Sequence, residues 1–208
     1  QILKNSFMNG SYTTPDTGLT KTYSSTFMEA AKTSGVSPYH LAARALQEQG
    51  TSGTSLSSGT VSGYTGYFNF FNIQAYAANG LTAVQNGAKY AATTNANFLL
   101  PWTNQYKAIV GGSIWIGTGY INREQDTLYL QKFDVTDGGN GYYSHQYMTN
   151  VQAAESEAKI MKTAYPEALF NSALEFKIPV YENMPDTAVS KPTSTASNNN
   201  LLDSISVN

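Results

Sequence analysis

Glu48 is the residue of this sequence whose type and surroundings point most directly to chemistry. It stands in "ALQEQG", in the last turn of a predicted helix whose apolar face includes Leu41 and Ala45. Since Glu48 follows Ala45 by three residues and Leu41 by seven, it lies at the margin of that face. Partial burial and the negative end of the helix dipole both favour the protonated form of a carboxylic acid. Such an acid can donate a proton to a leaving oxygen atom.

Glu48 is also isolated from other acids, because no Asp or Glu follows it before Glu124. Position alone favours the simpler interpretation of Glu48 as a solvated surface charge. An acid–base pair would have to take its second carboxylate from Glu124, from Asp126 or from acids further along the chain.

The composition excludes several classes of partner. Charged residues make up 12% of the chain, against about 25% in a typical globular protein. A net charge of -2 gives no basic surface for nucleic acid, and no apolar run is long enough to span a membrane. With no cysteine and only two histidines, a thiolate or histidine-rich metal site is not expected.

Local signals predict a mainly helical chain. Apolar periodicity and end signals favour helices over four ranges: 24–35, 37–50, 107–121 and 150–165. The first would begin at Ser24 or Ser25 and end at Gly35, and the second would have Pro38 in its first turn and Gly50 as its end.

The remaining segments are less regular. The Gly/Ser/Thr-rich stretch 51–66 is interpreted as a mobile surface loop, and 126–135 as an ambiguous segment that could be a strand. A turn is expected at Gly138, Gly139 and Gly141. On the last predicted helix, Asn150 is a candidate cap, and Glu155 and Glu157 are expected on a solvated face.

Four separated motifs resemble those of one enzyme family. "HLAARALQEQGTSG" resembles the acid-bearing helix of glycoside hydrolase family 73, the endo-β-N-acetylglucosaminidases of bacterial cell-wall autolysins. "TGYFNFFNIQAY" is similar to its Tyr-Asn-Phe-Phe-Gly-Ile segment, "AIVGGSIWIGTGYINREQDTLYLQKFDV" to its Tyr-Ile-Asn-x-Gly-Gln-x-Thr-Leu-Tyr helix end, and "HQYMTNV" to its His-Gln-Tyr-Ala-Thr-Asp-Ile element. The motifs occur in family order over roughly residues 23–165, and clostridial autolysin domains are the expected nearest relatives.

The resemblance implies a mainly α, lysozyme-like α+β fold with a substrate cleft between lobes. It implies that Glu48 is the general acid and that Tyr147 acts close to the reacting sugar. The residues that match the segment lining the cleft are Tyr67, Asn69, Phe70 and Phe71.

The aromatic residues allow two interpretations. Tyr64, Tyr67 and Phe70 could stack on GlcNAc rings or pack in the core. Asn69 could bind an acetamido group or cap a turn, and His145 could serve the site or the structure. The residues expected in the core are Phe71, Ile73 and Trp115.

Two departures from the family pattern bear on mechanism. Asn72 stands where the family usually has Gly, and Glu124 stands where Gly is common, which makes Glu124 a poor match for a family catalytic residue. Some relatives carry a second glutamate after the Phe-Gly-Ile segment, but "QAYAANGLTAVQNGAKYAATT" has no acid. A paired carboxylate would therefore come from elsewhere, or the 2-acetamido oxygen of the substrate would attack the anomeric carbon.

The function that the resemblance implies is a secreted, cell-wall-associated peptidoglycan hydrolase. It would cleave the β-1,4 bond between GlcNAc and MurNAc in glycan strands, without metal or cofactor. A lytic transglycosylase and a catalytically silent glycan-binding module are the competing hypotheses. Residues 1–186 would form the catalytic domain and 187–208 a Ser/Thr/Asn-rich linker or tail, with wall-anchoring modules elsewhere in a longer chain.

Overall fold

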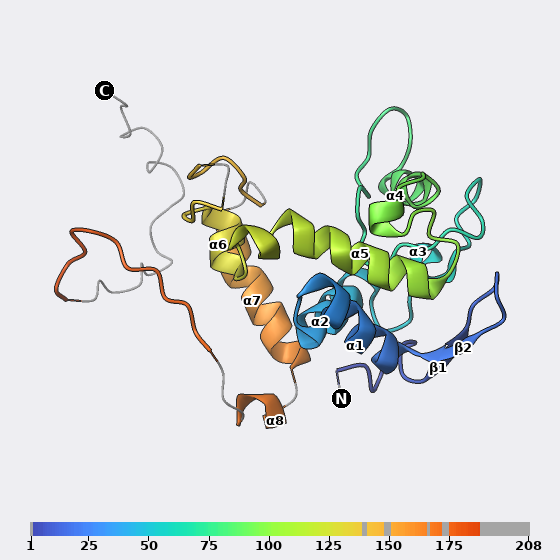
Figure 1. Ribbon diagram of the computed structural model, residues 1–208, viewed down its shortest axis with the longest axis horizontal. Helices are drawn as coiled ribbons and strands as arrows, with labels where there is room; N and C mark the ends of the chain where they lie inside the picture. The colour runs from blue at the N-terminus through green and yellow to red at the C-terminus, as the bar shows by residue number, and fades with distance from the viewer. Residues whose placement is uncertain (1, 139–140, 148–150, 166, 172–174, 188–208) are drawn as a thin grey trace, which may run out of the picture. The chain divides into compact units, whose positions relative to one another are not determined.

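The computed structural model describes residues 2–138, 141–147, 151–165, 167–171 and 175–187 (Figure 1). Contacts within the chain divide it into two compact units, residues 1–174 and 175–208. Every helix and strand of the described residues belongs to the first unit. The predicted tail, 187–208, lies outside the described residues except for Thr187, so its boundary stays a prediction.

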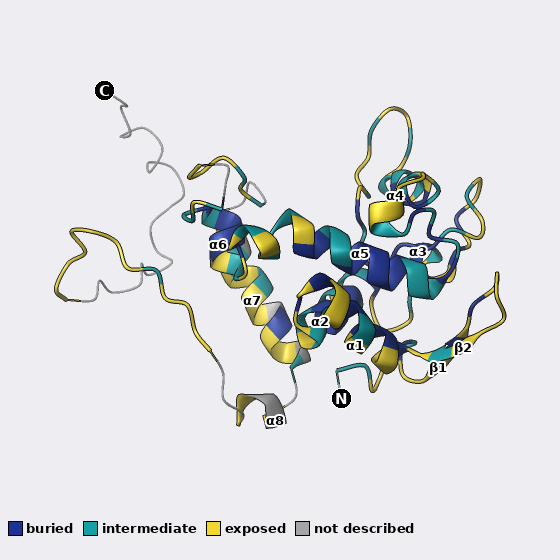
Figure 2. Cartoon of the chain, in the orientation of Figure 1, coloured by how far each residue is buried: buried dark blue, intermediate teal, exposed yellow. Residues whose placement is uncertain are grey.

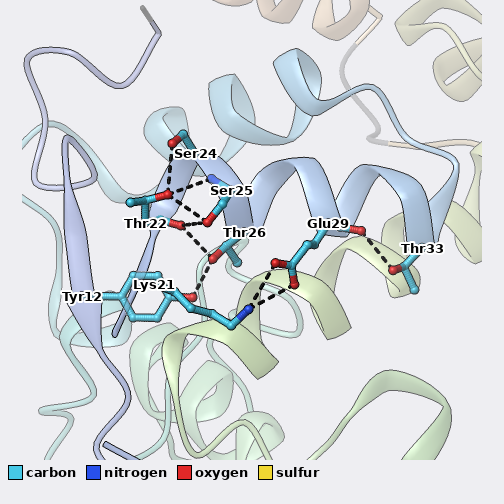
Figure 3. Close-up of polar contacts among 8 residues, drawn as sticks. All are labelled: Tyr12, Lys21, Thr22, Ser24, Ser25, Thr26, Glu29 and Thr33. Carbon is cyan, nitrogen blue, oxygen red and sulfur yellow. Dashed lines mark hydrogen bonds and ion pairs between the residues drawn. The ribbon is translucent and has the colours of Figure 1, made fainter. Parts of the chain in front are cut away.

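The first helix, α1 (Tyr23–Ser34), begins directly after a short hairpin of β1 (Ser11–Thr13) and β2 (Thr20–Thr22). The hydroxyl of Thr22 accepts a hydrogen bond from the backbone N–H of Ser25 at 3.1 Å, which caps the helix (Figure 3). The predicted caps, Ser24 and Ser25, are therefore wrong, because both lie inside the first turn.

The same region joins the hairpin to the helix through side chains. The hydroxyls of Tyr12 and Thr26 are hydrogen-bonded at 2.7 Å, and Lys21 forms an ion pair with Glu29 at 3.1 Å (Figure 3). At its other end α1 stops at Gly35, whose positive φ of 74° gives the predicted left-handed end.

Two further helices follow the predicted limits closely. The helix α2 (Pro38–Gln49) has Pro38 in its first turn and ends at Gly50, and α5 (Gln105–Gly119) covers most of the predicted range 107–121. Figure 1 shows α5 running through the middle of the first unit, and α1 packs against both α5 and α2.

Two glycines in α5 allow other segments of the chain to approach this helix closely. A Cβ atom at Gly112 would lie 2.6 Å from the ring of Phe71, and one at Gly111 would lie 2.0 Å from the carbonyl oxygen of Phe98. Only a residue without a side chain fits at either position.

Two segments without a predicted helix each contain a short one. The stretch 51–66 contains α3 (Ser55–Ser58), which has a capping box from Thr54 and buries Leu56, so it is not simply a loop. The ambiguous segment 126–135 contains α6 (Leu128–Phe133), capped by Thr127, so a strand there is wrong. The cap decides this, because the apolar pattern fits both structures.

The last predicted helix is α7 (Ala153–Ala164), with Gln152 as its N-cap residue. Asn150 and Gly139 lie outside the described residues. The other helices of the first unit are α4 (Ala83–Ala91), η1 (Ala96–Phe98), η2 (Ile121–Arg123) and α8 (Glu167–Phe170).

The elements gather at the two ends of α5. The helices α3 and α4 contact each other at one end, and α6 and α7 contact each other at the other end (Figure 1). The buried faces of α1, α2 and α5 turn toward one another (Figure 2), and the core includes Leu41, Phe70, Trp102 and Ile109. The fold of the described residues is mainly α with one small sheet, as predicted.

Candidate active site

A cavity of about 280 Å³ opens beside the last turn of α2. Its walls come from α2, from the segment that follows Phe70, from the second half of α5 and from the segment before α7. The lining residues are Arg44, Glu48, Phe71, Asn72, Ile73, Gln74, Ala75, Trp115, Ile116, Tyr120 and Tyr147. Glu48 and Tyr147, the two predicted catalytic residues, thus face the same space.

Asn72 holds the carboxylate of Glu48 in place. The side-chain amide of Asn72 donates to Glu48 Oε2 at 2.8 Å and to the backbone oxygen of Glu48 at 3.3 Å. The backbone of Asn72 has φ of 50°, in the left-handed region that favours glycine and tolerates asparagine. This explains physically why glycine suits the position, and the asparagine adds a donor that a glycine lacks.

Gln49 connects α2 to the segment that carries Asn72. Its amide nitrogen donates to the carbonyl oxygens of Asn69 and Phe70, both at 3.2 Å, and to Asn72 Oδ1 at 3.0 Å. Its amide oxygen accepts from the hydroxyl of Thr54. Because Gln49 is 2% exposed, these bonds satisfy a polar group inside the protein and fix the wall of the cavity.

Arg44 joins α2 to Tyr147, 103 residues away in the sequence. The guanidinium donates to the hydroxyl of Tyr147 at 3.1 Å and lies 5.4 Å from the centre of its ring. The Nε of Arg44 is shielded from solvent and has no hydrogen-bond partner among the described residues. The site therefore holds one cationic donor with an unused N–H group.

Burial raises the pKa of Tyr147; the positive charge of Arg44 lowers it, and Glu157 and Glu48 raise it further. The phenol therefore keeps its proton near neutral pH. With Arg44 donating to its oxygen, Tyr147 has its own O–H available to donate to a ligand.

His145 and Gln125 hold the segment that presents Tyr147. His145 Nδ1 is hydrogen-bonded to Gln125 Oε1 at 2.8 Å, and its backbone N–H donates to Asp134 at 2.6 Å. Its ring lies 4.8 Å from that of Tyr120, and the backbone N–H of Tyr147 donates to the carbonyl of Gln131 at 2.7 Å. Since His145 does not line the cavity, its contacts favour the structural interpretation.

No protein-family model matches the chain. The bifunctional autolysin of Staphylococcus epidermidis is 31% identical to it over an alignment of 174 residues, which covers 79% of this chain and 12% of that protein. The bifunctional autolysin of Staphylococcus aureus is 31% identical over an alignment of 170 residues, which covers 79% of this chain and 13% of that protein. The chain is a homologue of staphylococcal autolysins.

Solved autolysin structures share the fold of this homologue. A crystal structure of a major bifunctional autolysin is 30% identical, with a TM-score of 0.53 over 79% of this chain and 59% of that one. The S. aureus glucosaminidase B structure is 29% identical, with a TM-score of 0.50 over 68% of this chain and 52% of that one. The predicted mainly α, lysozyme-like class is confirmed. The chain spans about an eighth of the length of the curated autolysins it matches.

Two of the predicted substrate-binding residues are in the interior. Phe70 is 0% exposed and packs in the core, so a sugar ring cannot stack on it. Asn69 is also 0% exposed, and its amide nitrogen donates to the carbonyls of Ile73 and Gly87 while its oxygen accepts from the N–H of Ile73. Both substrate contacts are therefore wrong, and Asn69 fixes a turn instead.

The three other predicted contacts have different surroundings. Phe71, 3% exposed, belongs to the core and also lines the cavity wall. Tyr67 is half-buried against the main core, and Tyr64 is half-buried against a small cluster around Leu56. Neither tyrosine lines the cavity with Glu48, so their contact with sugar stays a prediction.

Neither expected second acid reaches the cavity. Glu124 is exposed and ends η2 with φ of 65°, and Asp126 is exposed two residues later. No group of three or more His, Asp or Glu side chains that could hold a metal ion occurs in the described ranges.

Arg44 and Tyr120 line the cavity but were not singled out from the sequence, and Asn72 was noted only as a departure from the family pattern. Trp115, expected in the core, is half-buried on the cavity wall. The sequence did hold a usable signal for Arg44, because it lies four residues before Glu48 on the same face of the helix.

A second cavity, of about 210 Å³, shares Gln74 with the cavity of Glu48 and is lined by Tyr76, Asn86 and Lys89 among others. None of the described helices is long and apolar enough to cross a membrane.

Proposed function

We propose that this autolysin homologue is an endo-β-N-acetylglucosaminidase that cleaves the β-1,4 bond between GlcNAc and MurNAc in peptidoglycan. The observation that carries the proposal is the shared cavity of Glu48 and Tyr147, with Asn72 and Arg44 orienting them. The similarity to bifunctional autolysins and to glucosaminidase B supports the same activity.

In this proposal Glu48 is the general acid. Asn72 holds one carboxylate oxygen, which leaves the other free to carry the proton to the glycosidic oxygen that departs with MurNAc. The phenol of Tyr147 then donates to the sugar near the reacting carbon, for which the 2-acetamido group is a suitable acceptor.

The second half of the reaction is assigned to the substrate. Apart from Glu48, no Asp or Glu among the described residues lines the cavity. The 2-acetamido oxygen would therefore attack the anomeric carbon as the bond to the leaving oxygen breaks, and water would open the resulting cyclic intermediate. No metal or cofactor enters any step.

The proposed partner is the glycan strand of peptidoglycan. A strand needs more room than one sugar, and the second cavity, which shares Gln74 with the first, extends the available groove. We place the enzyme outside the cell, in association with the wall, within a longer chain that carries wall-anchoring modules. Residues 1–186 would be its catalytic domain.

Analysis of muropeptide products tests the proposal. Purified peptidoglycan is digested with the wild type, with Glu48→Gln and with the matched control Glu124→Gln, whose exposed side chain is outside the cavity. Fragments ending in reducing GlcNAc are expected from the wild type and the control, and none from Glu48→Gln.

Other products would contradict it. Fragments ending in anhydro-MurNAc would identify a lytic transglycosylase. Binding of the wall without any product would identify a catalytically silent glycan-binding module, and unchanged products from a folded Glu48→Gln protein would remove the assigned acid.

A further inference from the structure

The second cavity, of about 210 Å³, adjoins the cavity of Glu48, because both are lined by Gln74. Its walls come from α4, from the residues just after that helix and from the segment before it. The amide nitrogen of Asn86, on α4, donates to the backbone oxygens of Tyr76 at 2.7 Å and Ala78 at 3.2 Å. These bonds hold the segment before α4 against the helix and so set the shape of the cavity.

The second cavity lies within a part of the chain that has no acids. No Asp or Glu occurs between Glu48 and Glu124, and all the residues that line the cavity fall in the range 74–93. No carboxylate therefore lines this cavity. Its surface favours an anionic group, which a carboxylate in the wall would repel.

Lys89 is the charged residue that lines the second cavity. Among the described residues, its ammonium group has no ion-pair or hydrogen-bond partner, whereas Lys107, also in the acid-free part, pairs with Asp16 at 3.5 Å. Lys89 lies in the last turn of α4, where a cation also stabilises the helix through its dipole. That role leaves the ammonium group free to bind an anion.

The proposed substrate carries an anion next to the reacting sugar. In the proposed function, the sugar beside Glu48 is GlcNAc, and GlcNAc alternates with MurNAc along the strand. This GlcNAc therefore has MurNAc on both sides, whichever way the strand runs past Glu48. MurNAc bears a lactyl group whose carboxyl is either free or joined to a stem peptide with carboxylates of its own. The cavity that adjoins the cavity of Glu48 thus receives a sugar with an anionic substituent.

We propose that the second cavity is a subsite for MurNAc, in which the ammonium group of Lys89 binds a carboxylate of the lactyl-peptide substituent. The inference rests on the proposed function, because cleavage after GlcNAc is what places MurNAc in the adjoining cavity. Lys89 determines specificity and takes no part in breaking the bond. The side chain of Tyr76, 60% exposed, offers an aromatic face for the sugar ring in the same cavity.

The test is a comparison of kcat and KM on three kinds of soluble glycan strand. The first carries stem peptides, the second has been stripped of them so that the lactyl carboxylate is free, and the third is the stripped strand with its carboxyl groups reduced to alcohols. Lys89→Gln should raise KM by about threefold to tenfold on an anionic strand, the effect of losing one exposed, charge-assisted contact.

The other kinetic values should stay nearly constant. In Lys89→Gln, kcat should change by less than about twofold, because the lost contact contributes to binding and not to the transition state alone. On the carboxyl-reduced strand, the wild type and Lys89→Gln should have the same KM. The anionic strand on which KM rises identifies the carboxylate, which belongs either to the stem peptide or to the lactyl group.

Two variants serve as matched controls. Lys32→Gln removes the same charge from an exposed lysine in the last turn of α1, outside both cavities, and should leave KM unchanged on every strand. Lys89→Arg keeps the charge and should keep KM within about twofold of the wild type. Raising the salt concentration should reduce the difference between the wild type and Lys89→Gln. Circular dichroism establishes that each variant is folded.

The outcomes separate this inference from the proposed function. A folded Lys89→Gln protein with the wild-type KM on both anionic strands would overturn the inference. An equal rise in KM on the carboxyl-reduced strand would also overturn it, because that rise cannot come from a carboxylate. The proposed function fails by a different result, the absence of reducing GlcNAc ends from the wild type. In that case the affinities of the wild type and Lys89→Gln for the anionic strands decide the inference, and equal affinities would overturn it.

Discussion

The last turn of α2 has two sides that use polar residues in opposite ways. Gln49 faces the interior, where both ends of its amide are hydrogen-bonded to other segments. Glu48, the preceding residue, faces the cavity, where Asn72 holds one carboxylate oxygen. Two adjacent residues thus serve the fold and the site separately.

The same contrast separates the two asparagines of "NFFN". Asn69 uses both its amide nitrogen and its amide oxygen on backbone groups of the interior, whereas Asn72 lies between Gln49 and Glu48. On the cavity side, Arg44 keeps a shielded N–H without a partner. Polar groups whose hydrogen bonds are all made inside the protein stabilise the fold, whereas Asn72 directs its amide at a carboxylate on the cavity wall.

The largest effect is expected on the cavity side. Glu48→Gln should lower the rate of peptidoglycan cleavage by about 100-fold to 10,000-fold, the range that general acids contribute. The melting temperature should change little, because an amide can still accept from Asn72. Reducing-end release and thermal melting measure the two quantities, and a large loss of stability would show that Glu48 also serves the fold.

On the interior side the expected effect is on stability. Gln49→Ala removes a buried group with four hydrogen-bond contacts and should lower the free energy of unfolding by about 2 to 4 kcal/mol. Urea unfolding measures this, with Gln47→Ala as the exposed control on the same turn. If Gln49→Ala were as stable as the control, the contrast between the two sides would not hold.

Asn72 connects the two sides and should show a smaller, mixed effect. Asn72→Gly fits the positive φ without strain and removes the donor to Glu48, so turnover should fall by about tenfold. The effect should appear in kcat rather than KM, because the glycine leaves the cavity wall open. An unchanged kcat would mean that Glu48 is positioned without this bond.

An effect confined to acidic pH concerns His40, one turn before Arg44. Burial and then the positive charge of Arg44 lower the pKa of His40 to about 4. Because the unfolded state binds this proton below about pH 6.5 and the folded state binds it only near pH 4, stability falls as the pH drops through that window. The loss that His40 contributes should be about 1 to 3 kcal/mol at pH 4.

His40→Gln isolates this contribution. Urea unfolding at pH 7 and at pH 4.5 should show a smaller decrease in stability for the variant than for the wild type. An equal decrease in both proteins would show that carboxylates alone cause the acid sensitivity.

The limits of several helices could be predicted from individual residues at their ends. Pro38 and Gly50 predicted the limits of α2, and Gly35 the end of α1, because these residues act on the backbone next to them. The cap of α1 and the helix α6 were missed, since Thr22 and Thr127 compete with other residues of similar propensity nearby.

The site was predicted only in part. Glu48 and Tyr147 were found through the motifs and face one cavity. Asn69 and Phe70 belong to the same motif as Asn72, but a motif does not tell which of its side chains point inward. Glu157 was expected on a solvated face but is half-buried, in a helix that packs against α2 and α6.

The sequence by itself determined where α2 starts and stops and that Glu48 lies at the margin of its apolar face. Those properties depend on neighbours within one or two turns. The tertiary structure decided that Arg44 meets Tyr147 across 103 residues, and that Glu48 faces a cavity while Gln49 faces the interior. Burial and charge pairing come from segments far apart in the chain, and only their packing brings those groups within range of one another.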